Sequence, residues 1–304
     1  MDLSIIILNY NTKDLTSTVI NSFISCMNHK ENSLLKYEII LTDNASTDGS
    51  KELFSQWQKE LPFFKYIYNE ENYGFGKSNN IGIRAASGKY ILLLNSDVIV
   101  DNVNFQDLIE RMENDNKIGV MTVELRLNEN EIDWASHRGF PTVWRSFTYF
   151  SKLERITRKI PLLNRLFGGY HMTYENLNKM HEIESPTAAF YLTTKKIMDA
   201  IQGFDEQFFM YGEDLDMSYR IKKLGYKIIY YPRYSVLHLK GQSTTRSNEA
   251  DIKSKTNFYF YDSMKIFYKK NYASNNPEFI NKFVYYFIDL KSKLSWKELA
   301  STRD

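Results

Sequence analysis

The chain has 304 residues, 43% of them apolar and 25% charged, which suits one large α/β domain with or without a helical appendage. A formal net charge of +2 argues against a general nucleic-acid-binding protein, which would carry a large basic excess. The single cysteine, Cys26, excludes an internal disulfide and a cysteine-rich zinc site, and it favours a reducing compartment.

The first hundred residues alternate between strand-like and helix-like patterns. Short apolar runs predict four strands, at residues 4–8, 37–41, 64–68 and 89–94. Helical patterns lie between them, and the clearest, at 14–29, repeats an apolar residue every four positions. This alternation predicts an α/β fold with a mainly parallel sheet and helices on both faces.

The second half of the sequence is less regular. Residues 125–180 show little periodicity, so we expect long connections there. Strand-like runs at 188–193 and 227–231 flank another helical pattern. An aromatic, helix-like segment follows, which predicts a helical C-terminal appendage over 246–304 after a domain over 1–245.

Polar side chains follow each of the four predicted strands of the first half. In chain order they are Asn9, Tyr10 and Asn11, then Asp43, then Asn72, and then Asn95, Ser96 and Asp97. The carboxyl ends of parallel strands meet at one edge of a sheet, and open α/β sheets bind ligands at that edge. These residues therefore predict a binding site.

Each candidate for chemistry also has a structural alternative. Asp97 could hold Mg²⁺ or Mn²⁺, which prefer oxygen ligands, or it could form a turn. Asp43 could accept a hydrogen bond from a pyrimidine N3–H, or belong to a network that caps the next helix. Asp214, with Glu213 orienting it or the acceptor, could be a general base, or the two could favour a helix dipole. His238 could be structural, and it becomes a candidate ligand only if it lies near Asp97.

Six segments, taken together and in this order, resemble glycosyltransferase family 2, whose members have the GT-A fold. They are SIIILNYNT, LTDNASTDGS, NEENYGFGKSNNIGI, YILLLNSDV, GFDEQFFMYGEDLDMSYRIKKLGYK and HLKGQS. The resemblance covers roughly four-fifths of the chain, from residue 3 to about 245. It is strongest with the rhamnosyltransferase-like branch, whose metal motif reads Asn-x-Asp and whose tail looks like FYFYDSMKIFYKKNY here.

The resemblance implies that residues 1–100 form the nucleotide-sugar half and residues 101–245 the acceptor half. Asp43 would contact the nucleotide base, and the backbone around Asn9, Tyr10 and Asn11 would line the base and ribose. Asn72 and Lys77 would lie near the ribose or diphosphate, and Asn95 and Ser96 are assigned to the same nucleotide-sugar site.

The same resemblance implies how the reaction is catalysed. Asp97 would bind Mg²⁺ or Mn²⁺ at the diphosphate, and His238 would complete the metal's shell. Asp214, with Glu213 beside it, would be the base of a single displacement that inverts the anomeric carbon. One departure is Thr187, which stands where many relatives carry glycine and therefore bears on donor or acceptor preference.

The branch resemblance favours transfer of L-rhamnose from dTDP-L-rhamnose to a hydroxyl of a glycan or lipid-linked acceptor in bacterial surface polysaccharide synthesis. The alternatives are a UDP-hexose or UDP-N-acetylhexosamine transferase of the same family, and a non-catalytic member that binds nucleotide. A nucleotidylyltransferase is disfavoured, because the residues after the first strand, Asn9-Tyr10-Asn11-Thr12, are not a glycine-rich phosphate loop.

Residues 138–165 combine aromatic residues with seven Lys or Arg residues and one acidic residue, Glu154. This segment could rest on anionic lipid headgroups or a lipid-linked diphosphate, or it could be a solvated face with its aromatics in the core. The apolar run at 5–8 is too short for a signal peptide, and no stretch approaches the ~20 apolar residues of a membrane helix. We therefore expect a cytoplasmic protein, at most peripheral at the inner face of the cell membrane, with no nucleic-acid partner.

Overall fold

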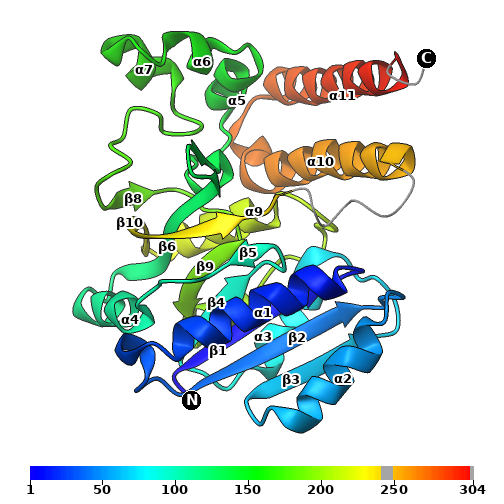
Figure 1. The fold of residues 1–304 in the computed structure, drawn as a ribbon. Coiled ribbons are helices and arrows are strands. Elements are labelled where there is room, and N and C mark those ends of the chain that lie inside the picture. Colours follow the sequence, from blue (N-terminus) through cyan, green and yellow to red (C-terminus); the bar gives the residue numbers. More distant parts are fainter. Residues whose placement is uncertain (241–248, 302–304) are drawn as a thin grey trace.

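The computed structural model describes residues 1–240 and 249–301, with side chains for 1–240 and 255–295. The described part contains one curled sheet in the order β3-β2-β1-β4-β9-β6-β10-β5, with β7 beside β6 and β8 beside β10 (Figure 1). The strands are β1 (Leu3–Asn9), β2 (Tyr37–Asn44), β3 (Phe64–Asn69), β4 (Tyr90–Leu94), β5 (Val98–Ile99), β6 (Ile118–Asn128), β7 (Glu131–Ile132), β8 (His181–Ile183), β9 (Phe190–Thr194) and β10 (Lys227–His238).

One half of the sheet is parallel, as predicted. The strands β3, β2, β1 and β4 all pair in parallel, and each of the four predicted strands appears. β1, β2 and β4 are mostly buried apolar runs, as expected for strands covered on both faces. The register of β1 against β2 places Asn9 beside Asp43, so the polar residues after these strands meet at one edge.

The other half makes the whole sheet mixed. β9 runs antiparallel to both β4 and β6, whereas β10 is parallel to β6 and antiparallel to β5 and β8. The sheet as a whole is therefore mixed, and its parallel pairings are those among β3, β2, β1 and β4 and that of β6 with β10. The alternation of patterns could not reveal this, because β9 follows an irregular stretch and not a helix that crosses over the sheet.

Helices cover both faces of the sheet, as predicted. Side chains of β1 alternate between the two layers, with Ile5 and Ile7 in one apolar cluster and Ile6 in the other. The first cluster includes residues of α1, α2 and α4, and the second includes residues of α3, α8 and α9. These helices are α1 (Lys13–Met27), α2 (Ser50–Glu60), α3 (Phe75–Ala85), α4 (Phe105–Asn114), α8 (Lys195–Ile201) and α9 (Glu213–Lys223).

Residues 125–180 contain the long connection that we expected, between β7 and β8, but it is not irregular throughout. They include three short helices, α5 (Val143–Phe150), α6 (Leu153–Thr157) and α7 (Pro161–Phe167), which form a helical tip at the top of Figure 1. Each is five to eight residues long, which is too short to show a clear helical period in the sequence.

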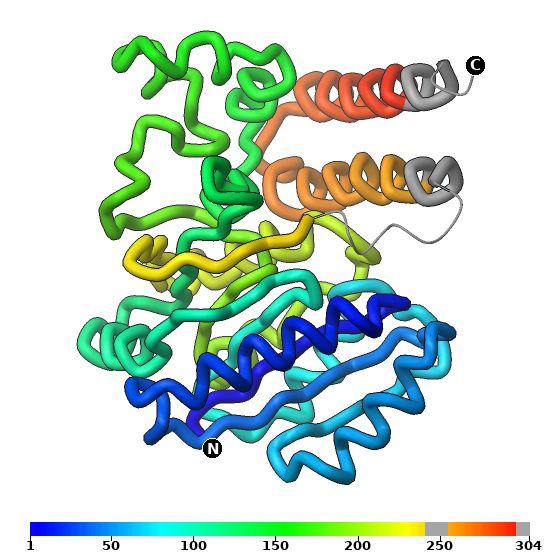
Figure 2. Tube along the Cα trace, in the orientation of Figure 1, coloured from blue at the N-terminus to red at the C-terminus, as the bar shows by residue number. Residues whose placement is uncertain are grey.

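The chain continues with two long helices, α10 (Glu249–Asn271) and α11 (Glu278–Ser301), as an antiparallel pair beside the helical tip (Figures 1 and 2). Phe267 of α10 packs in one cluster with Phe208 and Leu215, and the ring of Phe287 on α11 lies 6.1 Å from that of Phe150 on α5. The expected boundary at residue 245 lies outside the described residues. None of the helices in the described ranges has the length and hydropathy needed to cross a bilayer.

Candidate active site

A hydrogen-bonded network joins the ends of β1 and β2. Asn9 Nδ2 donates to Asp43 Oδ2 over 2.8 Å and to the hydroxyls of Ser46 and Ser50 over 3.0 Å each. Asp43 also accepts from the Tyr66 hydroxyl at 3.1 Å and from the backbone N–H of Ser46 at 2.8 Å. Asn9 and Asp43 are fully buried. Their side chains therefore hold this edge together in a local network, although the N-cap of α2, Gly49, receives no side-chain hydrogen bond.

Other predicted nucleotide-binding residues on this edge are accessible. Tyr10 is 47% exposed, and Asn11 adopts a left-handed backbone conformation with φ of 54°. The side chain of Asn72 accepts a hydrogen bond from the N–H of Gly74, which shapes the turn before α3. Lys77, in the first turn of α3, lies with its ammonium 4.0 Å from the centroid of a neighbouring tyrosine ring. These groups lie outside the chamber described next.

A chamber of about 670 Å³ lies beside the carboxyl end of β4. Its polar end is built from four separate segments of the chain. They contribute Asn95 and Asp97 after β4, Asp133 and Arg138 before α5, Glu213 and Asp214 at the start of α9, and His238 and Lys240 at the end of β10. The predicted metal and catalytic residues therefore line one space, as does Asn95, whereas Ser96 is not among its described lining residues.

Asp97 and His238 face each other in this chamber, both buried, with 3.3 Å between Oδ1 and Nε2. The other ring nitrogen of His238 lies 2.7 Å from Asp133, whose second oxygen accepts from Lys240 at 3.1 Å. Burial lowers the pKa of His238, but the carboxylates of Asp133 and Asp97 raise it more, to about 9. Asp97 Oδ1 is buried and has no hydrogen-bond partner.

This arrangement fits a divalent cation that also takes ligands from a substrate. Asp97 Oδ1 makes no hydrogen bond, and the imidazole of His238 becomes a ligand once it releases the proton that the two carboxylates favour. Both are donors that Mn²⁺ accepts, and such ions keep places for phosphate oxygens and water. Asp133 lies where the carboxylate partner of a metal-bound histidine normally lies. The described residues contain no group of three or more His, Cys, Asp or Glu suited to a metal, so the substrate would have to complete the shell.

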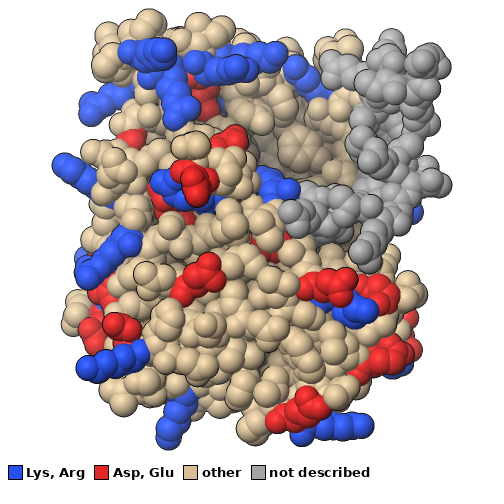
Figure 3. Space-filling model, in the orientation of Figure 1, with Lys and Arg blue, Asp and Glu red and all other residues tan. Residues whose placement is uncertain are grey.

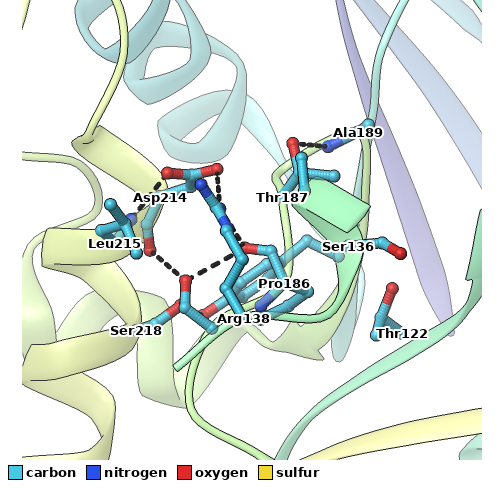
Figure 4. Close-up of polar contacts among 12 residues, drawn as sticks. Thr122, Ser136, Arg138, Pro186, Thr187, Ala189, Asp214, Leu215 and Ser218 are labelled. Carbon is cyan, nitrogen blue, oxygen red and sulfur yellow. Dashed lines mark hydrogen bonds and ion pairs between the residues drawn. The ribbon is translucent and has the colours of Figure 1, made fainter. Parts of the chain in front are cut away.

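Two neighbouring acids at the start of α9, Glu213 and Asp214, have different surroundings, and Figure 4 shows those of Asp214. Asp214 Oδ2 accepts from the Arg138 guanidinium at 2.6 Å, and its other oxygen accepts from the N–H of Leu215 at 2.7 Å. Arg138 also donates to the carbonyl of Pro186 at 3.1 Å. The side chains of the ion pair are only 11% and 10% exposed, so Arg138 gives Asp214 a buried counter-charge.

Glu213 lacks such a partner. Its side chain is buried, and Oε2 accepts no hydrogen bond. Burial and the adjacent negative charge of Asp214 raise the pKa of Glu213 to about 8. Burial and this repulsion therefore favour the protonated form of Glu213, whereas Asp214 has the Arg138 guanidinium as its counter-charge. Two acids with opposite roles in one site are typical of acid–base chemistry.

Sequence reasoning did not single out Asp133, Arg138 or Lys240. Lys240 lies two residues after His238, but Asp133 falls in the irregular stretch and no local pattern marks it. Arg138 was counted as one of the seven cations of 138–165, yet it is an internal ion-pair partner. Arg145 is another, because it pairs with Glu184.

A family model described as Glycosyl transferase family 2 matches residues 4–174. Over 143 residues the chain is 32% identical to an uncharacterized glycosyltransferase of Nostoc sp.. This alignment covers 46% of this chain and 42% of that protein. Over 209 residues it is 26% identical to the rhamnosyltransferase WbbL of Escherichia coli, in an alignment that covers 66% of this chain and 72% of that protein.

Among solved structures, a mannosyltransferase of Pyrobaculum calidifontis aligns with a TM-score of 0.57 at 13% identity, over 98% of this chain and 73% of that chain. At this identity the likeness shows the fold alone, which is of the GT-A type that we predicted. The chain spans 42%, 15% and 35% of the length of three curated relatives that it matches. Because the family model matches more than half of the chain, the protein belongs to glycosyl transferase family 2.

Proposed function

We propose that the protein is a metal-dependent, inverting glycosyltransferase that moves a sugar from a nucleoside-diphosphate donor to an acceptor hydroxyl. The observation that carries this proposal is the shared chamber, in which Asp214 and its counter-ion Arg138 lie in one space with Asp97 and His238. A base and a metal site within one cavity are the two devices that such a transfer requires.

In the proposed reaction Asp214 accepts the proton of the acceptor hydroxyl while that oxygen bonds to the anomeric carbon. The bond from this carbon to the diphosphate breaks in the same step, its electron pair goes to the departing oxygen, and attack from the opposite face inverts the configuration. Arg138 orients Asp214 through its 2.6 Å contact. Asp97 and His238 would hold a divalent cation, which would supply Lewis-acid stabilisation of the charge on the diphosphate. Glu213, protonated, is a hydrogen-bond donor toward the acceptor.

The nucleotide is assigned to the edge beside the chamber. The residues proposed to contact it are Asn9, Tyr10, Asn11, Asp43, Asn72, Lys77, Asn95 and Ser96. A carboxylate offers about four acceptor positions, and Asp43 already uses three of them internally. Asp43 therefore keeps one acceptor position, which a base would reach only by displacing part of the network that buries this side chain.

For the donor we propose dTDP-L-rhamnose and, as the setting, surface polysaccharide synthesis at the cytoplasmic side of the membrane. Support comes from the E. coli rhamnosyltransferase and from an N-acetylglucosaminyl-diphospho-decaprenol L-rhamnosyltransferase of Mycobacterium tuberculosis that is 24% identical. A UDP-hexose or UDP-N-acetylhexosamine is the alternative, because a poly(ribitol-phosphate) beta-glucosyltransferase is also a relative and a similar structure contains UDP-GlcNAc. The Pyrobaculum structure holds GDP-Man and Mn²⁺, which supports a metal and keeps GDP among the nucleotides to test.

Thermal unfolding tests the proposal, with dTDP, UDP, GDP or dTDP-rhamnose and with Mg²⁺, Mn²⁺ or EDTA. A ligand at 100 times its Kd adds ~2.7 kcal/mol, which is a shift of roughly 2–4 °C for a chain of this size. We expect a shift with dTDP compounds that requires metal, is lost in Asp97→Ala, and persists in Asp101→Ala, an exposed matched control. A larger shift with UDP would overturn the rhamnose assignment alone. No shift with any nucleotide would overturn the transferase proposal.

A further inference from the structure

The chamber extends beyond its polar end into a space between α5, α10 and α11. The lining there is apolar and includes Phe147 and Phe150 of α5, Met264 and Phe267 of α10, and Val284 and Phe287 of α11. None of the described lining residues on these three helices is charged. The charged lining residues all lie at the other end, with Asp97 and Asp214. One cavity therefore has a charged end and an apolar end.

The apolar end and the end with Asp214 belong to one continuous space, so a single molecule can occupy both. A large, mostly apolar pocket with a few polar groups at one end has the usual form of a ligand site. The donor is polar throughout and carries a diphosphate, so it suits the end with Asp97 and His238. We propose, on the basis of the proposed function, that the acceptor carries a long hydrocarbon chain and that this chain binds between α5, α10 and α11.

The helical tip beside this cavity has the features of a lipid-facing surface. Ile156, Ile160, Leu162 and Leu166 are between 50% and 80% exposed. Five exposed cations lie among them, namely Lys152, Arg155, Arg158, Lys159 and Arg165. Figure 3 shows Lys and Arg along this upper edge and a hollow in the face below it. Apolar side chains among cations fit the headgroup layer of an anionic bilayer, from which a hydrocarbon chain can enter the cavity.

Dodecyl phosphate, used below its micelle-forming concentration, is a probe with a long chain and an anionic head, and butyl phosphate is its short counterpart. Each buried methylene strengthens binding about fourfold, so we expect the wild type to bind the dodecyl compound at least 100-fold more tightly by calorimetry. Ser146 lies half-buried in the chamber wall on α5, and Ser146→Trp fills the apolar end. This variant should weaken dodecyl phosphate binding at least tenfold. Ser151→Trp, exposed at the end of the same helix and outside the lining, should not.

Val284→Trp on α11, with Tyr286→Trp at a 66% exposed position as its control, repeats the test if Ser146→Trp fails to fold. The nucleotide-induced thermal shift is measured on every variant. It shows whether the variant is folded and whether it binds nucleotide, independently of dodecyl phosphate binding. Equal binding of both phosphates, or full binding by both filled variants, would overturn the acceptor-chain proposal while nucleotide binding stands. So would conversion of a dimer to a monomer by Ser146→Trp, because the apolar end would then be an interface between two copies.

Discussion

Glu213→Gln should change how the stability of the protein depends on pH. The pKa of Glu213 is about 8 in the folded protein, against an ordinary value of 4.5. Between these two values the folded protein holds a proton that the unfolded chain has lost, so stability is present at low pH and falls as pH rises toward 8. Glutamine is neutral at every pH and has almost the same shape, so the variant lacks this dependence.

The expected magnitude follows from one proton. A difference of one bound proton between folded and unfolded states changes the free energy of unfolding by about 1.4 kcal/mol per pH unit. From pH 5.5 to pH 7.5, the free energy of unfolding of the wild type minus that of Glu213→Gln should therefore fall by about 2–3 kcal/mol. The difference should level off above pH 8. Urea unfolding followed by fluorescence and far-UV circular dichroism at several pH values measures both proteins.

The comparison isolates Glu213, because the two proteins share every other titratable group. A difference that stays constant with pH would mean that Glu213 carries the same charge in both states, and our argument from burial and repulsion would be refuted. A difference that rises with pH would mean that the carboxylate form is stabilised, which would require Arg138 to serve both acids. Asp214 would then lose its role as the one carboxylate of the pair.

Three further changes test other parts of the molecule. Arg138→Met should lower the free energy of unfolding at pH 7.5 by about 3–5 kcal/mol in urea, because it leaves a buried carboxylate without its counter-charge; a loss below 1 kcal/mol would show that the pair is not buried in solution. Asp43→Ala removes the acceptor of three internal hydrogen bonds and should lower the free energy of unfolding by about 2–4 kcal/mol. An unchanged urea midpoint together with weaker nucleotide binding would instead mean that Asp43 serves the ligand alone. Replacing three cations of the helical tip by Gln should weaken sedimentation with anionic vesicles at low salt roughly 100-fold, since each contributes about 1 kcal/mol. The three positions are Arg155, Arg158 and Lys159. If the wild type did not sediment with the vesicles, membrane contact would be rejected.

The sequence predicted best what local patterns determine. The strands β1, β2 and β4 contain short apolar runs with polar residues at or just after their ends, so both their existence and their shared edge could be inferred. Asp97, His238, Glu213 and Asp214 do line one chamber, although they lie in three separate stretches of the chain. The helices α5 to α7 were missed because five to eight residues show at most two turns of helical period. Arg138 was misjudged because an internal ion pair and a solvated cation look alike in a sequence.

The direction of β9 explains why the rest of the site could not be inferred. If β9 were parallel to β4, the residues that follow β9 would lie at the ligand edge. Those residues are the start of α8. Because β9 is antiparallel, with Phe190 opposite Leu94, it is the segment before it that arrives there. That segment carries Thr187 into the chamber, and its Ser185 and Pro186 carbonyls bind Arg138 through the backbone N–H and the guanidinium. The ion pair that orients the proposed base therefore depends on one strand direction, which strand and helix patterns along the chain do not encode.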